Sequence, residues 1–300
     1  MAEHTSSEID RQLPRADEIF LDHLAHFVPD AEAASRALAR AGFAPMPISV
    51  QVNPDLDGAP RPTGTGNVTA MFARGYIEVL FKTSETPLTR EFEAGLARHP
   101  GVHLAAFAVA DAAAARRRLA ETGFRVRPLV EMQRPVDADG RPATAAFTIA
   151  RVEPGEMPEG RIQILTHRTE PVVWQPRWLS HPNGARALMR VLVAVSDIAE
   201  AAPRFGCFTG RAPAPTPFGQ TIKLDRGRVD LLSADKFAHL LPEVPIPSLP
   251  FIGAYEIRVR SLTVASGLLM RAGLTVRQHN GELIAVFPPE LGLGAWLFAE

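Results

Sequence analysis

Three side chains in the N-terminal half of the sequence have the chemistry of metal ligands or proton carriers. His23 lies seven residues before Asp30, and His103 lies eight residues before Asp111, each in an apolar run of strand length. Glu78 lies in another apolar run, YIEVLF, where a carboxylate is costly to bury unless it is paired or metal-bound. A lone histidine on a strand is more often a packing residue than a ligand. Two histidines at matching places, together with Glu78, favour a shared functional site.

These residues belong to a unit that repeats along the chain. An apolar run leads to an aspartate that can cap a helix, then to an alanine-rich stretch that stops at a glycine. A proline-rich stretch with an Asp-Gly turn and a closing apolar run follow, which predicts one strand, one helix and three strands. Copies of this βαβββ pattern begin near residues 20 and 101, and weaker copies begin near residues 187 and 251. The helix caps predicted for them are Asp30, Asp111, Asp197 and Ser261.

Each unit is too small to close a core by itself, so we expect the units to pair. The sequence therefore predicts an α+β fold in which four βαβββ modules form two domains. Residues 1–18 are expected to form a flexible extension, residues 19–170 an N-terminal domain and residues 186–300 a C-terminal domain. Residues 171–185 are expected to be a linker, because the segment from Glu170 to Gly184 carries three prolines and two of the three tryptophans.

Several of these segments resemble the vicinal oxygen chelate superfamily. The resemblance rests on Leu21-Asp22-His23 and on the run from Tyr76 to Leu80. The loop from Gly64 to Asn67 and the segment Trp174…Trp178…His181-Pro182-Asn183-Gly184 are similar to its glyoxalase-like domain branch. The resemblance implies that both domains have the glyoxalase/bleomycin resistance/dioxygenase fold. It says less about the reaction, because the superfamily includes isomerases, lyases, extradiol dioxygenases, epimerases and metal-free resistance proteins.

The resemblance also implies a metal site in the N-terminal domain. Family ligands lie on the first and last strands of paired modules, and the corresponding residues here are His23, Glu78, His103 and Gln163. The first three form a set suited to a divalent Fe, Mn, Ni, Co or Zn ion. Gln163 replaces a glutamate that is common in the isomerases, and a neutral amide is a weaker ligand. No comparable set is expected in the C-terminal domain.

Six residues are predicted to contact the substrate, and each has a simpler alternative. Gln163 could instead orient another side chain or face solvent, and Thr65 and Asn67 could hold a turn. His181 and Asn183 could be ordinary linker residues. His26, three places from His23, is expected to face the other way and to pack. The predicted substrate contacts are Gln163, Thr65, Asn67, His167, His181 and Asn183.

The leading functional hypothesis is a metal-dependent lyase or isomerase acting on a small substrate bound through two vicinal oxygens. The metal would stabilise a developing enolate, and either Glu78 or a base on the substrate side would carry the proton. One alternative is an Fe(II) extradiol-type dioxygenase, although such relatives usually carry the metal in the second pair of modules. Another is a metal-free protein that binds or sequesters a small molecule in the domain cup.

The composition argues against several other classes of function. The formal net charge is -1, so no basic field favours nucleic acid or an anionic membrane. Cys207 is the sole cysteine, which excludes an intramolecular disulfide and cysteine-based metal motifs. The polar start lacks an apolar signal core, and we expect a cytoplasmic protein without a membrane span. The expected partner is a small-molecule substrate, and the resemblance allows a homodimer.

Overall fold

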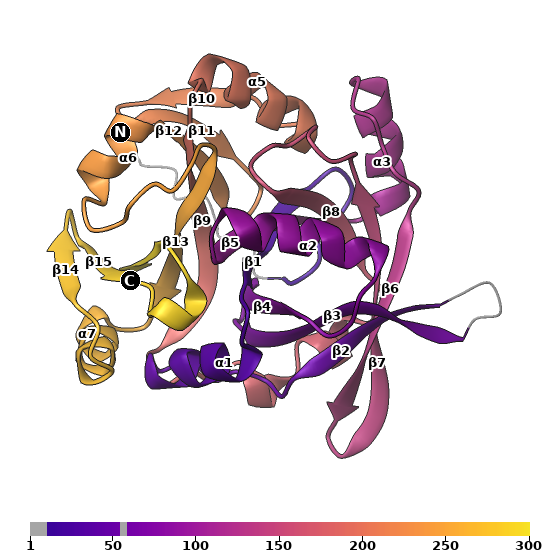
Figure 1. Cartoon of the computed structure of the whole chain (residues 1–300), viewed down its shortest axis with the longest axis horizontal. Coiled ribbons are helices and arrows are strands. Elements are labelled where there is room, and N and C mark those ends of the chain that lie inside the picture. Colours follow the sequence, from indigo (N-terminus) through magenta and orange to yellow (C-terminus); the bar gives the residue numbers. More distant parts are fainter. Residues whose placement is uncertain (1–10, 55–58) are drawn as a thin grey trace.

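The computed structural model describes residues 11–54 and 59–300, and its elements follow the repeated unit (Figure 1). Each module has one strand, one helix and three strands, as predicted. The first comprises β1 (Ile19–Phe27), α1 (Ala31–Arg40), β2 (Ser49–Pro54), β3 (Pro60–Met71) and β4 (Tyr76–Lys82). The second comprises β5 (Gly101–Val109), α3 (Ala112–Glu121), β6 (Val130–Ala138), β7 (Arg141–Arg151) and β8 (Arg161–His167).

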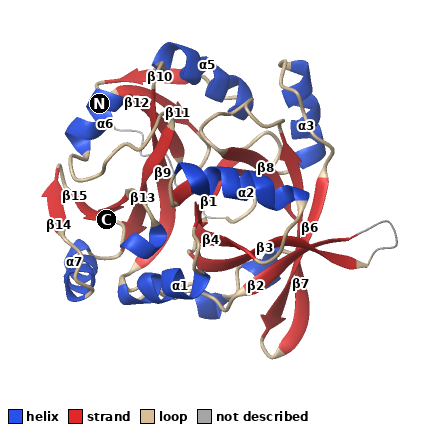
Figure 2. Ribbon diagram, in the orientation of Figure 1, coloured by secondary structure: helices blue, strands red, loops and turns tan. Residues whose placement is uncertain are grey.

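The C-terminal half contains two further modules. The third comprises β9 (Ala185–Val195), α5 (Ile198–Thr209), β10 (Pro213–Thr216), β11 (Gly219–Lys223) and β12 (Arg228–Ser233). The fourth comprises β13 (Phe251–Val259), α7 (Leu262–Arg271), β14 (Val276–His279), β15 (Glu282–Val286) and β16 (Ala295–Ala299). Five short or inserted elements lie outside the modules: α2 (Pro87–Arg98), α4 (Glu170–Val173), η1 (Pro176–Trp178), α6 (Ala234–Leu240) and η2 (Pro289–Leu291). The α+β class and the four paired modules are confirmed (Figure 2).

Local sequence signals explain where the module helices begin and where one hairpin turns. All four predicted caps accept a backbone hydrogen bond at the start of their helix: Asp30, Asp111, Asp197 and Ser261. Asp139 and Gly140 both have positive φ, 55° and 80°, as a two-residue turn between β6 and β7 requires. The corresponding Asp-Gly turn of the first module, residues 55–58, lies outside the described residues.

The modules pair differently in the two halves. The first two close into a barrel of order β1-β4-β3-β2-β6-β7-β8-β5, whereas the last two form an open sheet of order β10-β11-β12-β9-β13-β16-β15-β14. Within each half the first strands of the two modules are antiparallel neighbours, β1 with β5 and β9 with β13. The barrel closes on its other side between β2 and β6, where Val52 and Gln133 are the one registered pair among the described residues.

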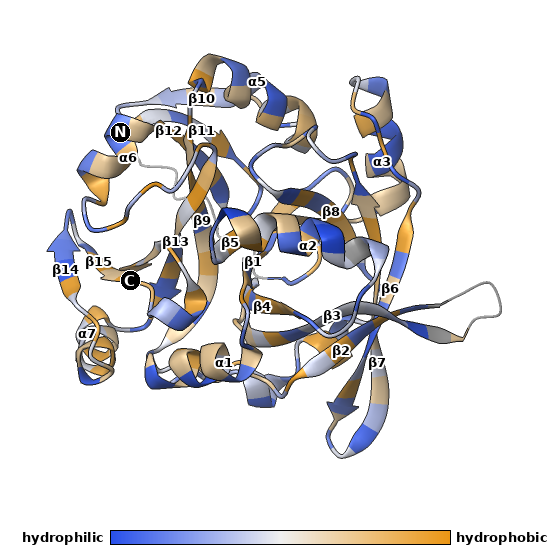
Figure 3. Ribbon diagram, in the orientation of Figure 1, coloured by the Kyte–Doolittle hydropathy of each residue, from blue (hydrophilic) through white to orange (hydrophobic). Residues whose placement is uncertain are grey.

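The two halves pack closely against each other. One hydrophobic cluster contains residues of both, including Leu21 and Val79 from the barrel and Val191 and Trp296 from the open sheet. Hydrophobic residues are concentrated along the central strands, including β9 and β13 (Figure 3). Main-chain hydrogen bonds also cross the junction, for example from Leu21 N–H to Arg226 O. The halves are therefore joined by core packing as well as by the connecting segment.

The segment between the halves is ordered and packs on the barrel. Residues 171–185 contain most of α4 and all of η1, and Trp174 is buried against His167 and Tyr76. Of the predicted N-terminal extension, residues 1–10 lie outside the described residues. Residues 11–18 have no helix or strand but contact the C-terminal half, where Arg226 donates to Arg11 O. No helix in the described part of the chain is long and apolar enough to cross a membrane.

Candidate active site

The interior of the N-terminal barrel contains part of the predicted site. Side chains along β1 and just after it alternate between two surroundings: Leu24 and, directly after the strand, Val28 pack in the core beneath α1, whereas Ala25 and Phe27 belong to a second core inside the barrel. His23 and Glu78 line a small inner cavity together with Asn67 and Gln163. Four of the predicted site residues therefore meet in one place.

His23 is held by an adjacent carboxylate. Strand pairing passes from Leu21–Phe107 to His23–Ala106, so Asp22 is the extra residue of a β-bulge. Asp22 is fully buried; its Oδ1 accepts a hydrogen bond from His23 Nδ1 at 2.7 Å and its Oδ2 accepts one from His167 Nε2 at 2.9 Å. Burial raises the pKa of Asp22, but the charges and hydrogen bonds of the two histidines outweigh this and hold its pKa well below the usual range. An ionised Asp22 fixes the hydrogen of His23 on Nδ1 and leaves Nε2 free.

The free nitrogen of His23 faces Glu78. The distance from His23 Nε2 to Glu78 Oε2 is 3.6 Å, longer than a hydrogen bond. The other carboxylate oxygen, Oε1, accepts from Asn67 Nδ2 at 2.6 Å and from Gln51 Nε2 at 3.2 Å. Thr65 in turn donates to Gln51 Oε1 at 2.8 Å. Predicted Thr65 and Asn67 thus support Glu78, and the ring of Tyr76 stacks on His23 with centroids 4.4 Å apart.

His103 does not join this group. It lies outside the inner cavity, its Nε2 donates to His99 O at 2.7 Å, and its ring packs against His99 and Phe27. The residue seven places before the cap Asp111 is Leu104, and it is Leu104 that lines the cavity. Strand pairing passes from Ala25–Leu104 to His26–Val102, so His103 is the extra residue of a second β-bulge and lies in the larger cavity rather than the inner one. The predicted convergence of His23, Glu78 and His103 is therefore corrected.

Arginines dominate the rest of the inner cavity. Arg134, Arg151 and Arg161 line it, and Glu78 is the only carboxylate among the described residues that do so. Arg151 Nε donates to Gln163 Oε1 at 2.9 Å, so the side-chain oxygen with which Gln163 was predicted to bind a metal already accepts a hydrogen bond. Burial, and next the charge of Arg161, lowers the pKa of Arg151 to about 9. The cavity volume is only about 20 Å³, close to that of one water molecule.

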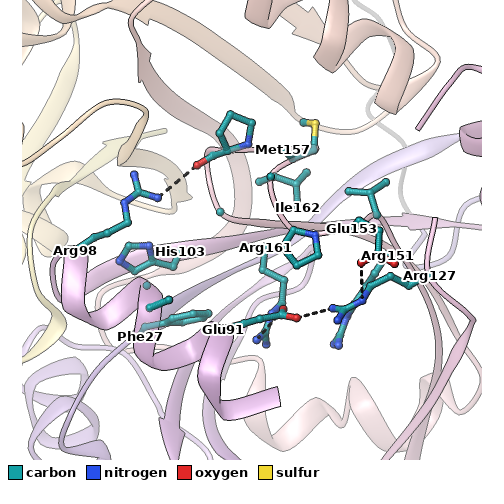
Figure 4. Close-up of a pocket in the computed structure, with 17 residues that line it drawn as sticks. Phe27, Glu91, Arg98, His103, Arg127, Arg151, Glu153, Met157, Arg161 and Ile162 are labelled. Atoms are coloured by element: carbon teal, nitrogen blue, oxygen red, sulfur yellow. Dashed lines mark hydrogen bonds and ion pairs between the residues drawn. The ribbon is translucent and has the colours of Figure 1, made fainter. Parts of the chain in front are cut away.

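A larger cavity adjoins the inner one beneath α2. Its volume is about 300 Å³, and Arg151 and Arg161 line both cavities. Helix α2 crosses the barrel, and Figure 4 shows its Glu91 between Arg161 and Arg127, with His103 beside Phe27. We call this larger cavity the mouth. It is at the small end of the range for ligand pockets.

His181 and Asn183 lie away from both cavities. His181 accepts from Ala44 N–H at 2.9 Å and donates to Met71 O at 2.7 Å. Asn183 donates to Ala41 O and accepts from Ala185 N–H, each at 3.0 Å. Both residues fasten the connecting segment to the barrel, in agreement with the simpler alternative. His167 reaches the site through Asp22.

The sequence also matches a known family of domains. The family model described as "Glyoxalase-like domain" matches residues 21–206, which is more than half of the chain. The chain belongs to this glyoxalase-like family. No curated protein shows significant sequence similarity to it.

Solved structures share the fold of this glyoxalase-like protein at low sequence identity. A hypothetical protein from Staphylococcus aureus has a TM-score of 0.63 at 10% identity, covering 93% of this chain and 98% of that one. A mutant of 4-hydroxymandelate synthase from Streptomyces coelicolor has a TM-score of 0.57 at 14% identity and covers 94% of each chain. The Mn(II)-bound glyoxalase from Novosphingobium aromaticivorans has a TM-score of 0.53 at 11% identity, covering 95% of this chain and 83% of that one.

The residues of this glyoxalase-like protein do not complete the expected metal centre. His23 Nε2 and Glu78 Oε2 are placed as two ligands, and the hydrogen bond from Nδ1 to Asp22 is the kind that orients ligand histidines. However, Leu104 stands where the second histidine is needed, and Gln163 is bound by Arg151. Within residues 11–54 and 59–300, no three His, Cys, Asp or Glu side chains are grouped to hold a metal.

Several residues of the site were not predicted from the sequence: Asp22, Gln51, Tyr76, Arg134, Arg151 and Arg161. Asp22 belongs to the motif Leu21-Asp22-His23, but one sequence alone does not predict the β-bulge that turns Asp22 toward His167. Tyr76 and Arg161 could have been found, since each lies two residues before a predicted site residue, Glu78 or Gln163, and so shares its face. Arg134 and Gln51 reach the site through tertiary pairing alone.

Proposed function

We propose that this glyoxalase-like protein is an enzyme that moves a proton on a small oxygenated substrate, in an isomerisation or a lysis. The observation that carries the proposal is the pair formed by His23 and Glu78. Asp22 fixes the hydrogen of His23 on Nδ1, and the free Nε2 lies 3.6 Å from Glu78 Oε2. A histidine whose Nδ1 hydrogen is held by a buried carboxylate, as Asp22 holds that of His23, can serve as a general base through Nε2.

The two groups have complementary roles in this proposal. His23 Nε2 takes a proton from the carbon beside a carbonyl group, and Asp22 stabilises the imidazolium that forms. Glu78 is fixed through Oε1, so Oε2 remains free to hold or return a proton. Donor groups of Asn67, Gln163 and the cavity arginines stabilise negative charge that develops on the substrate oxygen.

Proton abstraction can be tested before the substrate is known. Small 2-oxo and 2-hydroxy carbonyl compounds, neutral and anionic, are incubated with the protein in D₂O, and loss of C–H signals is followed by proton NMR. We expect accelerated exchange for at least one compound. His23→Asn and Glu78→Gln should lower that rate by about 100-fold or more.

His181→Gln is the matched control for this experiment. It alters a buried histidine that lies away from both cavities, and its rate should stay within a few-fold of the wild-type rate. An equal loss in His181→Gln and His23→Asn would contradict the proposed assignment. Binding of a compound with no exchange would instead favour the sequestration hypothesis.

A divalent metal is the second candidate for this site. The orientation of His23 by Asp22 supports it, as does the Mn(II) named for the N. aromaticivorans glyoxalase, but the described part of the chain places only two ligands, His23 and Glu78. Metal analysis of protein purified without chelator, and after addition of Mn(II), tests it. One equivalent that is lost in His23→Asn and Glu78→Gln would support a metal enzyme, and binding unaffected by both variants would contradict it.

A further inference from the structure

We infer that the substrate is a small organic anion whose charged group binds Arg161 and Arg151 in the mouth, at the place now taken by Glu91. The inference rests on the proposed function, because it names the substrate class of the same site. The shared chemistry is a group with two or more anionic oxygens, a carboxylate or a phosphate, which the planar guanidinium group binds through paired N–H donors.

The first argument is the imbalance of charge inside the barrel. Among the described residues, three arginines and one carboxylate, that of Glu78, line the inner cavity. Arg134 is 4% exposed and Arg151 is 9% exposed, so solvent screens these charges poorly. Asp22 does not compensate for them, since both of its oxygens are used by histidines. Buried cations without a compensating negative charge are costly, and an anion bound among them would offset that cost.

The second argument is the state of Arg161. Its Nε and Nη2 atoms are buried, and neither has a hydrogen-bond partner among the described residues. Its nearest carboxylate is that of Glu91, with 3.8 Å between Nη2 and Oε2, which is too long for a hydrogen bond. The guanidinium group also lies over the ring of Phe27, 5.5 Å from its centroid. Arg161, which lines the mouth, therefore has unused donors.

The third argument is the position of Glu91 on α2. Its Oε1 accepts from Arg127 Nη1 at 2.6 Å, while Oε2 points to Arg161 without bonding it (Figure 4). A partly exposed glutamate that neutralises an arginine at a distance is easily replaced by a ligand carboxylate with better geometry. Arg127 would keep Glu91 nearby, so the exchange does not require α2 to unfold.

The fourth argument is the path from the mouth to the proton carriers. Arg151 and Arg161 line both cavities, and Arg161 lies two residues before Gln163 on β8. An anionic group bound there directs the rest of the molecule toward His23 and Glu78. The mouth volume of about 300 Å³, at the small end of the range for ligand pockets, suits a small molecule.

Binding of three small molecules tests the inference. Pyruvate, inorganic phosphate and neutral hydroxyacetone are titrated calorimetrically into the full-length protein at constant ionic strength. We expect at least one anion to bind tenfold or more tightly than hydroxyacetone, and the better anion identifies the kind of charged group. Arg161→Gln should weaken its binding by at least tenfold, whereas Glu91→Gln should strengthen it several-fold.

Arg125→Gln is the control, because Arg125 pairs with Glu156 on the surface and does not line the mouth. Its binding should equal that of the wild type. Equal binding of anions and hydroxyacetone, or equal effects of Arg161→Gln and Arg125→Gln, would overturn the inference. If Arg161→Gln does not fold, Glu91→Gln provides the test. Anion binding that is unchanged or weaker in Glu91→Gln would also overturn the inference.

The inference and the proposed function fail in different ways. His23→Asn removes the proposed base but leaves Arg161 and Arg151, so it should still bind the anion with wild-type affinity. Proton exchange that depends on His23 without anion binding would overturn only the substrate class. Anion binding that depends on Arg161 without His23-dependent exchange would overturn only the proposed reaction.

Discussion

A buried chain of hydrogen bonds from His167 through Asp22 to His23 determines which nitrogen of His23 can accept a proton. Asp22 accepts from both rings, at 2.7 and 2.9 Å, and its lowered pKa keeps it ionised at neutral pH. An amide at this position could donate as well as accept, and it would no longer fix the hydrogen of His23 on Nδ1. The activity should therefore depend on a residue that does not line the inner cavity.

We predict that Asp22→Asn lowers the rate of proton exchange by about 10- to 100-fold, as loss of an orienting carboxylate does elsewhere. Proton NMR in D₂O measures the effect. His167→Gln is the matched comparison, because it removes the second partner of Asp22 and leaves the hydrogen bond to His23. A larger loss in His167→Gln than in Asp22→Asn would contradict this role for Asp22.

Leu104 explains why the metal prediction was only partly supported by the site. The sequence contains a sign of this. His103 lies eight residues before its helix cap, whereas His23 lies seven residues before its own cap. His103 corresponds to the bulge residue Asp22, which also lies eight residues before its cap, and Leu104 corresponds to His23, so similar spacing was insufficient. The nearby histidine was mistaken for the counterpart of His23.

We predict that Leu104→His creates a better divalent-metal site, since it adds an imidazole to the cavity of His23 and Glu78. Binding of Co(II) should become at least tenfold tighter than in the wild type, with a ligand-field absorption band as the readout. Leu165→His adds a histidine elsewhere in the same cavity and is the control. Equal Co(II) affinity in wild type and Leu104→His would contradict the register assigned to β5.

At the scale of elements, the helix caps and hairpin turns were the most predictable features. Each depends on a short-range signal, such as an aspartate before an alanine-rich stretch or an Asp-Gly pair. The position of α2 was not predicted, because it is an insertion between modules and depends on tertiary contacts. Phe92 on α2 is buried against Phe27, and Gly95 allows the helix to approach the rings of Phe27 and His103.

We predict that Gly95→Leu destabilises the protein by about 1–3 kcal/mol, as measured by urea unfolding. A Cβ atom at Gly95 would lie 3.0 Å from Phe27 Cδ2 and 3.3 Å from His103 Cγ. Gly267→Leu on α7 is the control, because a Cβ atom there meets only Arg271 Nη1, at 3.4 Å. It should be neutral or stabilising, since leucine favours helix more than glycine does. A similar loss in both variants would contradict close packing of α2.

At the scale of the whole molecule, a hydrogen-bonded chain crosses the junction of the halves. Trp296 Nε1 donates to Tyr255 Oη at 2.7 Å, that hydroxyl donates to His26 Nε2 at 2.8 Å, and His26 Nδ1 donates to Leu291 O at 2.8 Å. The sequence predicted that His26 faces away from His23, and it does. Its partners could not be predicted, because they come from the other half of the chain.

We predict that the free energy of unfolding falls at acidic pH because His26 is buried in its neutral form. Burial lowers its pKa from 6.5 to about 4, so the unfolded state binds the proton first and stability falls as the pH drops from 6.5 toward 4. From pH 7 to pH 5 this histidine alone should remove about 2 kcal/mol from the free energy of unfolding. The loss between these pH values, measured with urea, should be smaller in His26→Leu than in the wild type.

The control is His239→Gln, which changes an exposed histidine on α6 and should show the full wild-type loss. Comparing each variant with itself at two pH values separates the proton effect from the general destabilisation that His26→Leu causes. An undiminished acid loss in His26→Leu would mean that another group is responsible.

The sparse pairing between β2 and β6 has a consequence for how fast backbone amides in the barrel wall exchange with solvent. Val52 and Gln133 are the registered backbone pair there, and Gln51 and Arg134, on either side of it, face the inner cavity. Releasing one pair removes one or two hydrogen bonds, with a net cost of about 1–3 kcal/mol. Among the described residues, this line therefore has fewer backbone pairs than the other ladders of the barrel. Backbone amides along it should exchange with solvent sooner than those of β1 or β5.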